Sequence, residues 1–305
     1  MSLIRVIKDI FISKARSEFS QTETDSPPDS YIGLIADRLS SGDISGAEEM
    51  CCELLETFPD NAKAISLQHA IHLAIVQDRF PGPNYLEWLA WFHTSRRPGS
   101  YVEIGVETGQ SLQFAQPPTR AIGIDPAIHI VHSQETWVKL FKLTSDEFFT
   151  RHDLQEVLGA GNVDLVFIDG LHTFDQALKD FMNVERFSAP ESIVLFHDIL
   201  PVIPVTAMRE RNSTFWVGDT WKVMLILLKY RPDLRIFTIP AFPSGLAVVT
   251  NLDAHSGSLH QDFERICQEA LTLELDKYLP EIDEHLHVVA NNFDAMTRVL
   301  ENPKT

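Results

Sequence analysis

The chain is poor in cysteine and in basic side chains. Only 3 of its 305 residues are cysteines, and Cys51 and Cys52 are adjacent, so the sequence supports neither a disulfide framework nor a paired-cysteine metal motif. Lys and Arg number 25 against 43 Asp and Glu, which gives a formal net charge of −18. Such a surface repels the phosphates of nucleic acids. We therefore expect a protein of a reducing, cytoplasmic compartment that does not bind nucleic acid.

Long hydrophobic runs are also missing. The apolar run 223–228 is far too short to cross a bilayer, and no hydrophobic signal segment opens the chain. Residues 1–19 place Ile4, Ile7 and Phe11 on one face of a predicted helix. This helix could lie on a membrane surface or dock on protein, and its few basic residues favour docking. We expect no stable membrane insertion.

Changes in composition divide the chain into four predicted parts. Residues 1–30 form an N-terminal helix and a polar linker, and residues 31–80 are helical. Residues 81–252 form the main domain, and residues 253–305 form an acidic helical appendage. The helical parts at the two ends could mediate self-association.

The helical part has the spacing of a known repeat. A first helix ends at Leu39 in the pattern L-x-x-G-D, a second carries the small Ala47, and a break follows at Pro59. Over residues 31–77 this pattern resembles one tetratricopeptide repeat. An isolated repeat cannot bury its apolar face alone, so we expect it to pack on other parts of the protein or on a second chain.

In the main domain, short apolar runs alternate with helical stretches. This alternation predicts an α/β fold with a mostly parallel sheet covered by helices on both faces. The last two runs are too close for a crossover helix, so they should form an antiparallel hairpin at one edge. Seven strands of this kind are typical of a Rossmann-like, seven-stranded methyltransferase sheet. The predicted strands are residues 100–105, 120–125, 139–143, 163–169, 192–198, 234–239 and 245–250.

A glycine turn follows the first predicted strand. The segment from Glu103 to Ser111 contains Gly105 and Gly109, four residues apart, and leads into a predicted helix. Glycine there lets the backbone approach a ligand closely. The segment is not G-x-G-x-x-G and lacks G-K-[ST], which argues against a dinucleotide fingerprint and against a P-loop.

An acidic residue, Asp125, ends the next predicted strand, where its carboxylate could accept hydrogen bonds from ribose hydroxyls. The glycine turn and Asp125 together resemble the S-adenosylmethionine site of class I methyltransferases. The resemblance implies that the turn, with Glu103, Gly105, Gly109 and Ser111, takes the methionine end of the cofactor. It also implies that Ser145 and Asp146 lie near the adenine.

Two further predicted strands end in acids and imidazoles. One is followed by Asp169 and His172, and the next ends in His197 and Asp198. Asp169 could simply cap a helix, but helix capping does not explain a second His/Asp pair at the neighbouring strand end. Carboxylate, imidazole and water ligands suit Mg²⁺ or Mn²⁺.

The string D-G-L-H-T-F-D-Q-A-L-K-D-F, followed by V-L-F-H-D, carries a more specific resemblance. Over about residues 100–250 the chain resembles the class I family of macrocin-type sugar O-methyltransferases and cephalosporin-hydroxylase-like proteins. The resemblance implies a metal bound by Asp169 and Asp198, with His172 as the base. The chain departs from the family at His197, where a carboxylate is usual, so a metal-ligand role for His197 is open.

These observations predict a metal-assisted, S-adenosylmethionine-dependent O-methyltransferase acting on a small-molecule or glycan acceptor. A cephalosporin-hydroxylase-like enzyme on the same scaffold is an alternative, and so is a non-catalytic protein that senses the cofactor. In the segment 201–221, Trp216 and Trp221 could stack on a sugar face or pack in the core.

Overall fold

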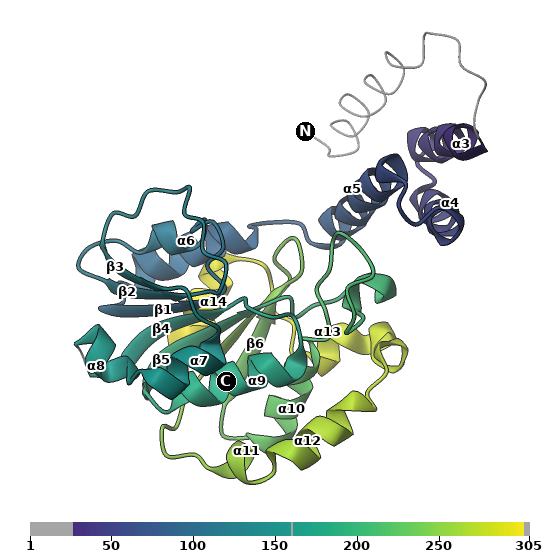
Figure 1. The fold of residues 1–305 in the computed structure, drawn as a ribbon. Coiled ribbons are helices and arrows are strands. Elements are labelled where there is room, and N and C mark those ends of the chain that lie inside the picture. Colours follow the sequence, from purple (N-terminus) through teal and green to yellow (C-terminus); the bar gives the residue numbers. More distant parts are fainter. Residues whose placement is uncertain (1–26, 160, 302–305) are drawn as a thin grey trace. The chain divides into compact units, whose positions relative to one another are not determined.

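The computed structural model describes residues 27–159 and 161–301 (Figure 1). The predicted amphipathic helix at residues 1–19 lies outside these ranges. The described residues form two compact units, one of residues up to Phe80 together with Arg211–Trp216, and one of Pro81–Glu210 together with Val217 onward.

The first unit contains three helices, α3 (Pro27–Ser41), α4 (Ile44–Thr57) and α5 (Ala62–Arg79). Asp43 and Asn61 cap the N-termini of α4 and α5 with their side chains. The helices share a small apolar core of Ile32, Ile35, Leu39, Ala47, Cys51, Leu54, Ala64, Leu67 and Ile71. Helix α3 already begins at Pro27, inside the predicted linker, because proline is well tolerated in the first helical turn.

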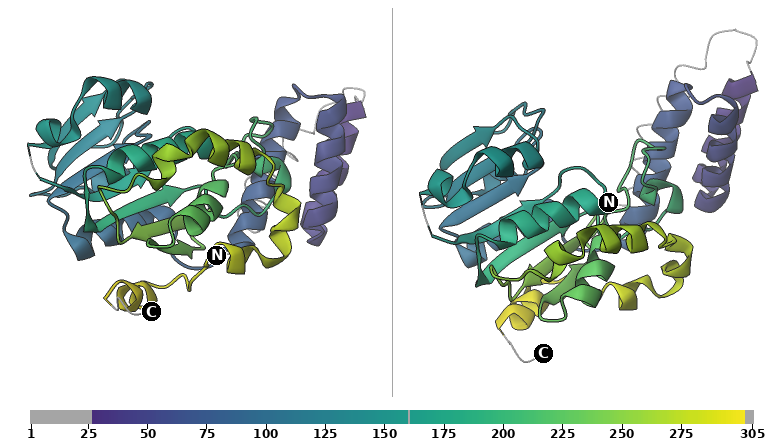
Figure 2. Two further views of the ribbon diagram at one scale, coloured as in Figure 1. Left: turned by 90° about the horizontal axis from the view of Figure 1, so that it is seen from below. Right: turned by 60° about the horizontal axis from the view of Figure 1, so that its bottom comes forward.

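The second unit is built on one seven-stranded sheet with the order β3-β2-β1-β4-β5-β7-β6 (Figure 1, Figure 2). The first five strands in this order, β3, β2, β1, β4 and β5, pair in parallel, whereas β7 runs antiparallel to both β5 and β6. The predicted Rossmann-like methyltransferase sheet with an antiparallel hairpin at one edge is therefore confirmed. The strands are β1 (Ser100–Ile104), β2 (Arg120–Ile124), β3 (Trp137–Phe141), β4 (Val163–Ile168), β5 (Ser188–His197), β6 (Arg235–Ile239) and β7 (Leu246–Thr250).

Two strands begin two or more residues before their predicted starts. Strand β3 begins at Trp137, two residues before the predicted start, because Trp137 and Val138 pair with the first residues of β2. Strand β5 begins at Ser188, where it pairs with Val163 ahead of an irregularity in the β4–β5 register. Both strands still end near the predicted positions, so the residues that follow β5 are placed as expected.

Helices cover both faces of this sheet. On one face, α6 (Tyr85–Arg96) and α14 (Phe293–Glu301) pack on the sheet through Trp88, Phe92 and Met296. On the other, α9 (Phe174–Glu185) contacts β4 and β5, and α10 (Lys222–Tyr230) packs on α9. The shorter helices are α7 (Ser145–Arg151), α8 (Leu154–Leu158), α11 (Ser258–Gln261), α12 (Phe263–Leu271), α13 (Ile282–His285), and the 3-10 turns η2 (Leu112–Phe114), η3 (Pro204–Ala207), η4 (Leu275–Lys277) and η5 (Leu279–Glu281).

Asn291 and Met296, near the end of the described chain, pack in the core between α6 and the sheet. Asn291 accepts a hydrogen bond from Trp88 Nε1 at 2.7 Å and donates to the carbonyls of Pro81, Pro83 and Pro240. Met296 of α14 is fully buried in the core under α6. Among the described residues, no helix is both long and apolar enough to span a bilayer.

Candidate functional site

Four parallel strands deliver the predicted residues to one edge of the sheet. Strands β1, β2, β4 and β5 run in the same direction, so their carboxyl ends lie at the same edge. Gly105 follows β1, Asp125 follows β2, Asp169 follows β4 and Asp198 follows β5. The sequence prediction of one shared rim is reproduced by this register.

The glycine turn and the end of β4 touch directly. Gly105 has a φ of +92°, and a Cβ built on it would lie 1.8 Å from the carbonyl oxygen of Asp169. Gly109 also has a positive φ, +78°, and a Cβ there would lie 2.9 Å from Ile130 Cδ1. Any larger residue at Gly105 would therefore push the turn away from Asp169.

The Glu103 side chain supports this turn from inside the protein. Glu103 is fully buried, and its carboxylate accepts hydrogen bonds from Tyr101 Oη and Ser111 Oγ, both at 2.6 Å. Burial raises the pKa of Glu103 to about 8, although the Ser111 and Tyr101 hydrogen bonds lower it. Glu103 and Ser111 are thus joined to each other beneath the turn.

Asp125 connects the turn to the loop after β2. Its Oδ2 accepts from the backbone N–H of Glu107 at 3.0 Å, and its Oδ1 accepts from the N–H of Ala127 at 2.6 Å. A carboxylate has about four lone-pair sites, so each oxygen retains capacity for a further donor. Asp125 can therefore hold the turn and accept hydroxyl hydrogen bonds together.

Ser145 and Asp146 begin α7, and α9 adds two residues that the sequence analysis missed. The Gln176 amide donates to Ser145 Oγ and Asp146 Oδ1 at 3.1 Å, and to Asp180 Oδ1 at 3.0 Å. Burial raises the pKa of Asp180 to about 6, although the hydrogen bonds from Ser145 and Gln176 lower it. The i, i+4 spacing of Gln176 and Asp180 on a predicted helix was the available signal.

The acidic rim forms a compact cluster. Asp169, His172 and Asp198 each offer one ligand atom within 4.8 Å of the others. His172 Nδ1 lies 3.0 Å from Asp198 Oδ2, and His172 Nε2 lies 3.6 Å from Asp169 Oδ1. Asp198 adopts a left-handed backbone conformation with a φ of +58°, which is uncommon for a residue with a Cβ.

The donor set of this cluster fits a divalent cation. Asp198 Oδ2 is buried, and within the described part of the chain His172 Nδ1 lies 3.0 Å from it. Carboxylates gathered at one strand edge repel one another, and a bound cation would offset that repulsion. Two carboxylates and an imidazole are ligands that suit Mg²⁺ or Mn²⁺.

His197 has a different environment from His172. Its Nδ1 lies 3.2 Å from Asp169 Oδ1, and its Nε2 lies 3.2 Å from Ser244 Oγ. Burial lowers the pKa of His197, but Asp169 and Asp198 outweigh it, so the net shift is upward. The pKa of Asp169 is lowered, because the two histidines outweigh the effect of its burial. Both ring nitrogens of His197 thus have protein partners.

Contacts from Gly218 and Asp219 hold the backbone of His172, and Arg209 pairs with Asp219; we call these three residues the clamp. The carbonyl of His172 accepts from Asp219 N at 3.2 Å, and a Cβ on Gly218 would lie 1.8 Å from that oxygen. Asp219 Oδ1 also accepts from Phe174 N at the start of α9, at 3.0 Å. Arg209 pairs with Asp175 at 2.8 Å and with Asp219 at 3.4 Å. This clamp holds His172 at the N-terminus of α9.

Of the two alternatives left open for Trp221, the structure shows packing in the core. Trp221 is 1% exposed and packs against Tyr278, with ring centroids 5.5 Å apart. Trp216 belongs to the other compact unit, where the Arg211 guanidinium lies over its ring. Trp221 lies at the start of α10, where its ring is buried in the core and is not available to a ligand.

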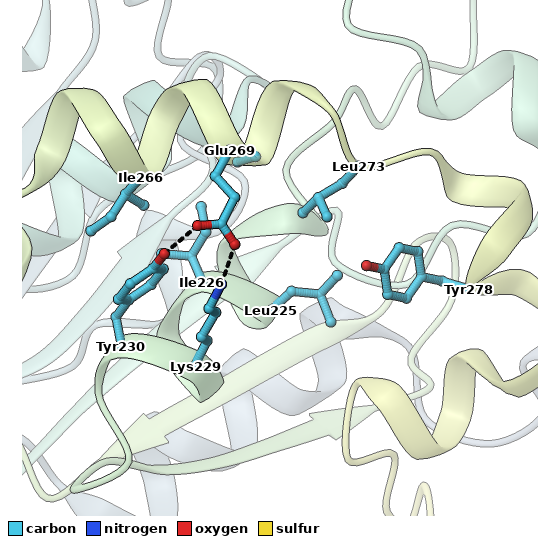
Figure 3. A pocket seen from close by; sticks show the side chains of 9 residues that line it. Leu225, Ile226, Lys229, Tyr230, Ile266, Glu269, Leu273 and Tyr278 are labelled. Atoms are coloured by element: carbon cyan, nitrogen blue, oxygen red, sulfur yellow. Dashed lines mark hydrogen bonds and ion pairs between the residues drawn. The ribbon is translucent and has the colours of Figure 1, made fainter.

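A separate pocket of about 250 Å³ lies between α10, α12 and η4 (Figure 3). Glu269 in its lining forms an ion pair with Lys229 and accepts a hydrogen bond from the Tyr230 hydroxyl. The rest of the lining is largely aliphatic. This pocket lies on helices rather than at strand ends, and its acid already has two partners, so it is not the candidate site.

Comparisons with known proteins agree with the position of the rim. Residues 102–199 match the sequence model of a methyltransferase domain. Comparison with the curated proteins gave no match.

Three solved structures match parts of this chain. The O-methyltransferase TomG from Streptomyces achromogenes, in complex with S-adenosylmethionine, is 16% identical, with 55% of this chain and 80% of that chain covered and a TM-score of 0.41. An O-methyltransferase from Bacillus cereus, in complex with S-adenosylhomocysteine, is 10% identical, with 82% and 97% covered and a TM-score of 0.41. The Podospora anserina methyltransferase PaMTH1, bound to S-adenosylhomocysteine, is 15% identical, with 60% and 86% covered and a TM-score of 0.37.

The segment matched by the family model contains every residue of the rim, from the glycine turn after β1 to Asp198 after β5. The sheet around it is the predicted seven-stranded, mostly parallel sheet with an antiparallel hairpin at one edge. Over residues 102–199 the chain is therefore similar to a methyltransferase domain.

Proposed function

We propose that the protein is a divalent-metal-assisted O-methyltransferase that acts on a hydroxyl of a sugar-containing or other small-molecule acceptor. The observation that carries this proposal is the cluster of Asp169, His172 and Asp198 at the strand edge. The cluster touches the glycine turn through the Gly105–Asp169 contact, so a cofactor at the turn and a cation at the cluster would be neighbours.

The cofactor would lie along the ends of β1, β2 and β3. The backbone at Gly105 and Gly109 would approach its methionine end, with Glu103 and Ser111 supporting the turn from below. Asp125 would accept from the ribose hydroxyls. Ser145 and Asp146, which Gln176 fixes at the start of α7, would border the adenine. The bound sulfonium supplies an activated methyl group.

Asp169 and Asp198 would hold the cation. When bound, a divalent cation lowers the pKa of a coordinated acceptor hydroxyl and supplies a fixed point for its orientation. Vicinal hydroxyls, as in sugars, offer two oxygens to such a centre. The ligand atoms of the cluster, which lie within 4.8 Å of one another, support this assignment.

His172 would accept the proton of the acceptor hydroxyl. Its side chain is 26% exposed at the rim, whereas that of His197 is 8% exposed with both ring nitrogens partnered. A general base needs a ring nitrogen that can reach the substrate. The clamp by Gly218 and Asp219 would keep the imidazole in place during this transfer.

A methyl-transfer assay with sugar and other vicinal-diol acceptors tests the proposal. We expect turnover that excess EDTA abolishes and that Mg²⁺ or Mn²⁺ restores. Full turnover in excess EDTA would contradict the metal-assisted part of the proposal and favour a mechanism with a histidine as the sole base.

Two alternatives keep the same scaffold, namely a cephalosporin-hydroxylase-like enzyme and a non-catalytic cofactor sensor. Thermal-shift measurements with S-adenosylmethionine, S-adenosylhomocysteine, NAD and 2-oxoglutarate separate them from the leading proposal. Stabilisation by the first two compounds alone supports a methyltransferase site. Stabilisation by 2-oxoglutarate favours the hydroxylase-like alternative, and cofactor binding with no turnover on any acceptor favours the sensor.

The helices α3 to α5 would serve self-association or substrate cover, as the resemblance to a tetratricopeptide repeat implies. Leu34 is 53% exposed and Phe58 is 38% exposed on these helices. We expect the substitution Leu34→Glu to shift the sedimentation of the protein towards smaller species if the helices mediate self-association. Unchanged sedimentation and unchanged KM for the acceptor would contradict both roles.

A further inference from the structure

His197 is the last residue of β5, directly before Asp198, and both of its ring nitrogens face protein atoms. Its Nδ1 faces Asp169 Oδ1 at 3.2 Å, and its Nε2 faces Ser244 Oγ at 3.2 Å. In either protonation state of the ring, Nδ1 can donate to Asp169 while Nε2 shares a hydrogen bond with the Ser244 hydroxyl. This arrangement leaves no ring nitrogen to bind a cation.

The backbone of Ser244 is held by contacts of the turn between β6 and β7. Ser244 is 1% exposed, and its carbonyl accepts from Leu200 N at 2.7 Å, two residues after Asp198. A Cβ on the next residue, Gly245, would lie 2.5 Å from Leu200 Cβ, so this turn packs closely on the segment after β5. The turn therefore fixes Ser244 relative to both residues that end β5.

An aromatic ring covers the imidazole. The rings of Tyr85 and His197 have centroids 4.2 Å apart and are inclined by 32°. Tyr85 is the first residue of α6, and its N–H donates to the carbonyl of Phe242 in the same β6–β7 turn at 3.1 Å. The His197 ring is thus fixed by hydrogen bonds at both nitrogens and by packing on one face.

We propose that Ser244 and His197 form a positioning pair that orients the Asp169 carboxylate towards the cation, and that His197 is not itself a ligand. This inference depends on the proposed metal-assisted function. Hydrogen bonds from a second layer of residues orient metal ligands, and their loss commonly lowers metal affinity by about 10–100-fold. Tyr85 contributes by restricting the ring.

The test measures Mn²⁺ affinity by calorimetry and electron paramagnetic resonance on the full chain. We expect His197→Ala to weaken binding by about 10–100-fold. We expect His197→Asn to recover most of it, because the Asn amide can still donate to Asp169. Ser244→Ala should weaken binding in the wild-type background but not in the His197→Ala background. Ser192→Ala is the matched control, since Ser192 is also a buried serine and its hydroxyl donates to the carbonyl of Val163 at the start of β4.

Spectroscopy separates positioning from ligation. Electron spin-echo modulation of bound Mn²⁺ should show the same directly coordinated nitrogen content in the wild type and in His197→Asn. Loss of a coordinated nitrogen in His197→Asn would make His197 a ligand and overturn the inference. Unchanged affinity in His197→Ala, or additive effects of the two substitutions, would overturn it as well.

The proposed function has its own readout. A wild-type protein that binds no Mn²⁺ would overturn both this inference and the metal-assisted part of the proposal. Binding of S-adenosylmethionine by the same sample, measured separately, would then retain the methyltransferase part. Unfolding temperatures of all variants show whether a loss of affinity reflects a loss of fold.

Discussion

The carbonyl oxygen of Asp169 occupies the space that a Cβ on Gly105 would need, with 1.8 Å between the two positions. Through this contact the glycine turn of β1 and the acidic end of β4 share one boundary. A substitution that displaces the glycine turn would therefore also displace the backbone of Asp169.

Gly105→Ala should disrupt both sides of the site. The new methyl group would clash with Asp169, and the φ of +92° is strained for any residue with a Cβ. We expect at least a 10-fold loss of S-adenosylmethionine affinity by calorimetry, together with a lower unfolding temperature. Gly161→Ala is the control, because no atom lies within 4 Å of a Cβ there. Equal behaviour of the two variants would contradict the role of the contact.

Asp125→Ala should weaken S-adenosylmethionine binding. The substitution removes hydrogen bonds to ribose, which for a charged acceptor contribute about 1.5–3 kcal/mol each. It also frees the N–H groups of Glu107 and Ala127, which loosens the turn. Calorimetry should show an affinity loss of about 10²-fold, whereas Asp153→Ala, at the exposed start of α8, should show none. Unchanged affinity for Asp125→Ala would refute the ribose assignment.

Glu103 should make the protein less stable as the pH rises. Its pKa is about 8 in the folded protein against an ordinary value of 4.5, so the folded state binds more protons between these values. By linkage, the Glu103 contribution to the free energy of unfolding falls as the pH rises from about 4.5 to about 8. Urea unfolding at several pH values should show that Glu103→Gln lacks this component. An identical pH dependence of wild type and variant would show that Glu103 is ionised without cost.

Asp219→Ala should slow turnover more than it weakens cofactor binding. Its loss removes the cap on Phe174 N and leaves Arg209 and Lys222 without that partner, so the segment carrying His172 loosens. We expect kcat to fall by about 10-fold or more, with a nearly unchanged affinity for S-adenosylmethionine. Asp262→Ala, which breaks an exposed pair with Arg265, serves as the control. A kcat equal to that of the wild type would show that the clamp does not position His172.

The polar residues at the strand ends could be predicted from the sequence, because the end of an apolar run indicates where a buried strand ends. Asp125, Asp169 and Asp198 each follow such a run, and all three lie at the predicted edge. Tyr85 and Ser244 were not accessible, because only tertiary packing brings them to His197 from the start of α6 and from the β6–β7 turn.

The environments of individual residues were also beyond the sequence. The sequence places Glu103 near the end of β1 and so at the rim. Side chains alternate between the two faces of a strand, however, and Glu103 points into the core on the same face as Tyr101. Trp221 reads equally well as a stacking ring or a core ring, and only its burial distinguishes the two. The grouping of Arg211–Trp216 with the N-terminal helices depends on contacts that no local pattern encodes.

The most direct test of the central claim needs no knowledge of the acceptor. Calorimetry should measure the binding of S-adenosylmethionine and of Mn²⁺ to the wild type and to the double variant Asp169→Asn, Asp198→Asn. The account predicts that the wild type binds both, and that the double variant keeps S-adenosylmethionine but loses Mn²⁺ by at least 100-fold, about 2.7 kcal/mol. Failure of the wild type to bind S-adenosylmethionine, or equal Mn²⁺ affinity in the two proteins, would contradict it.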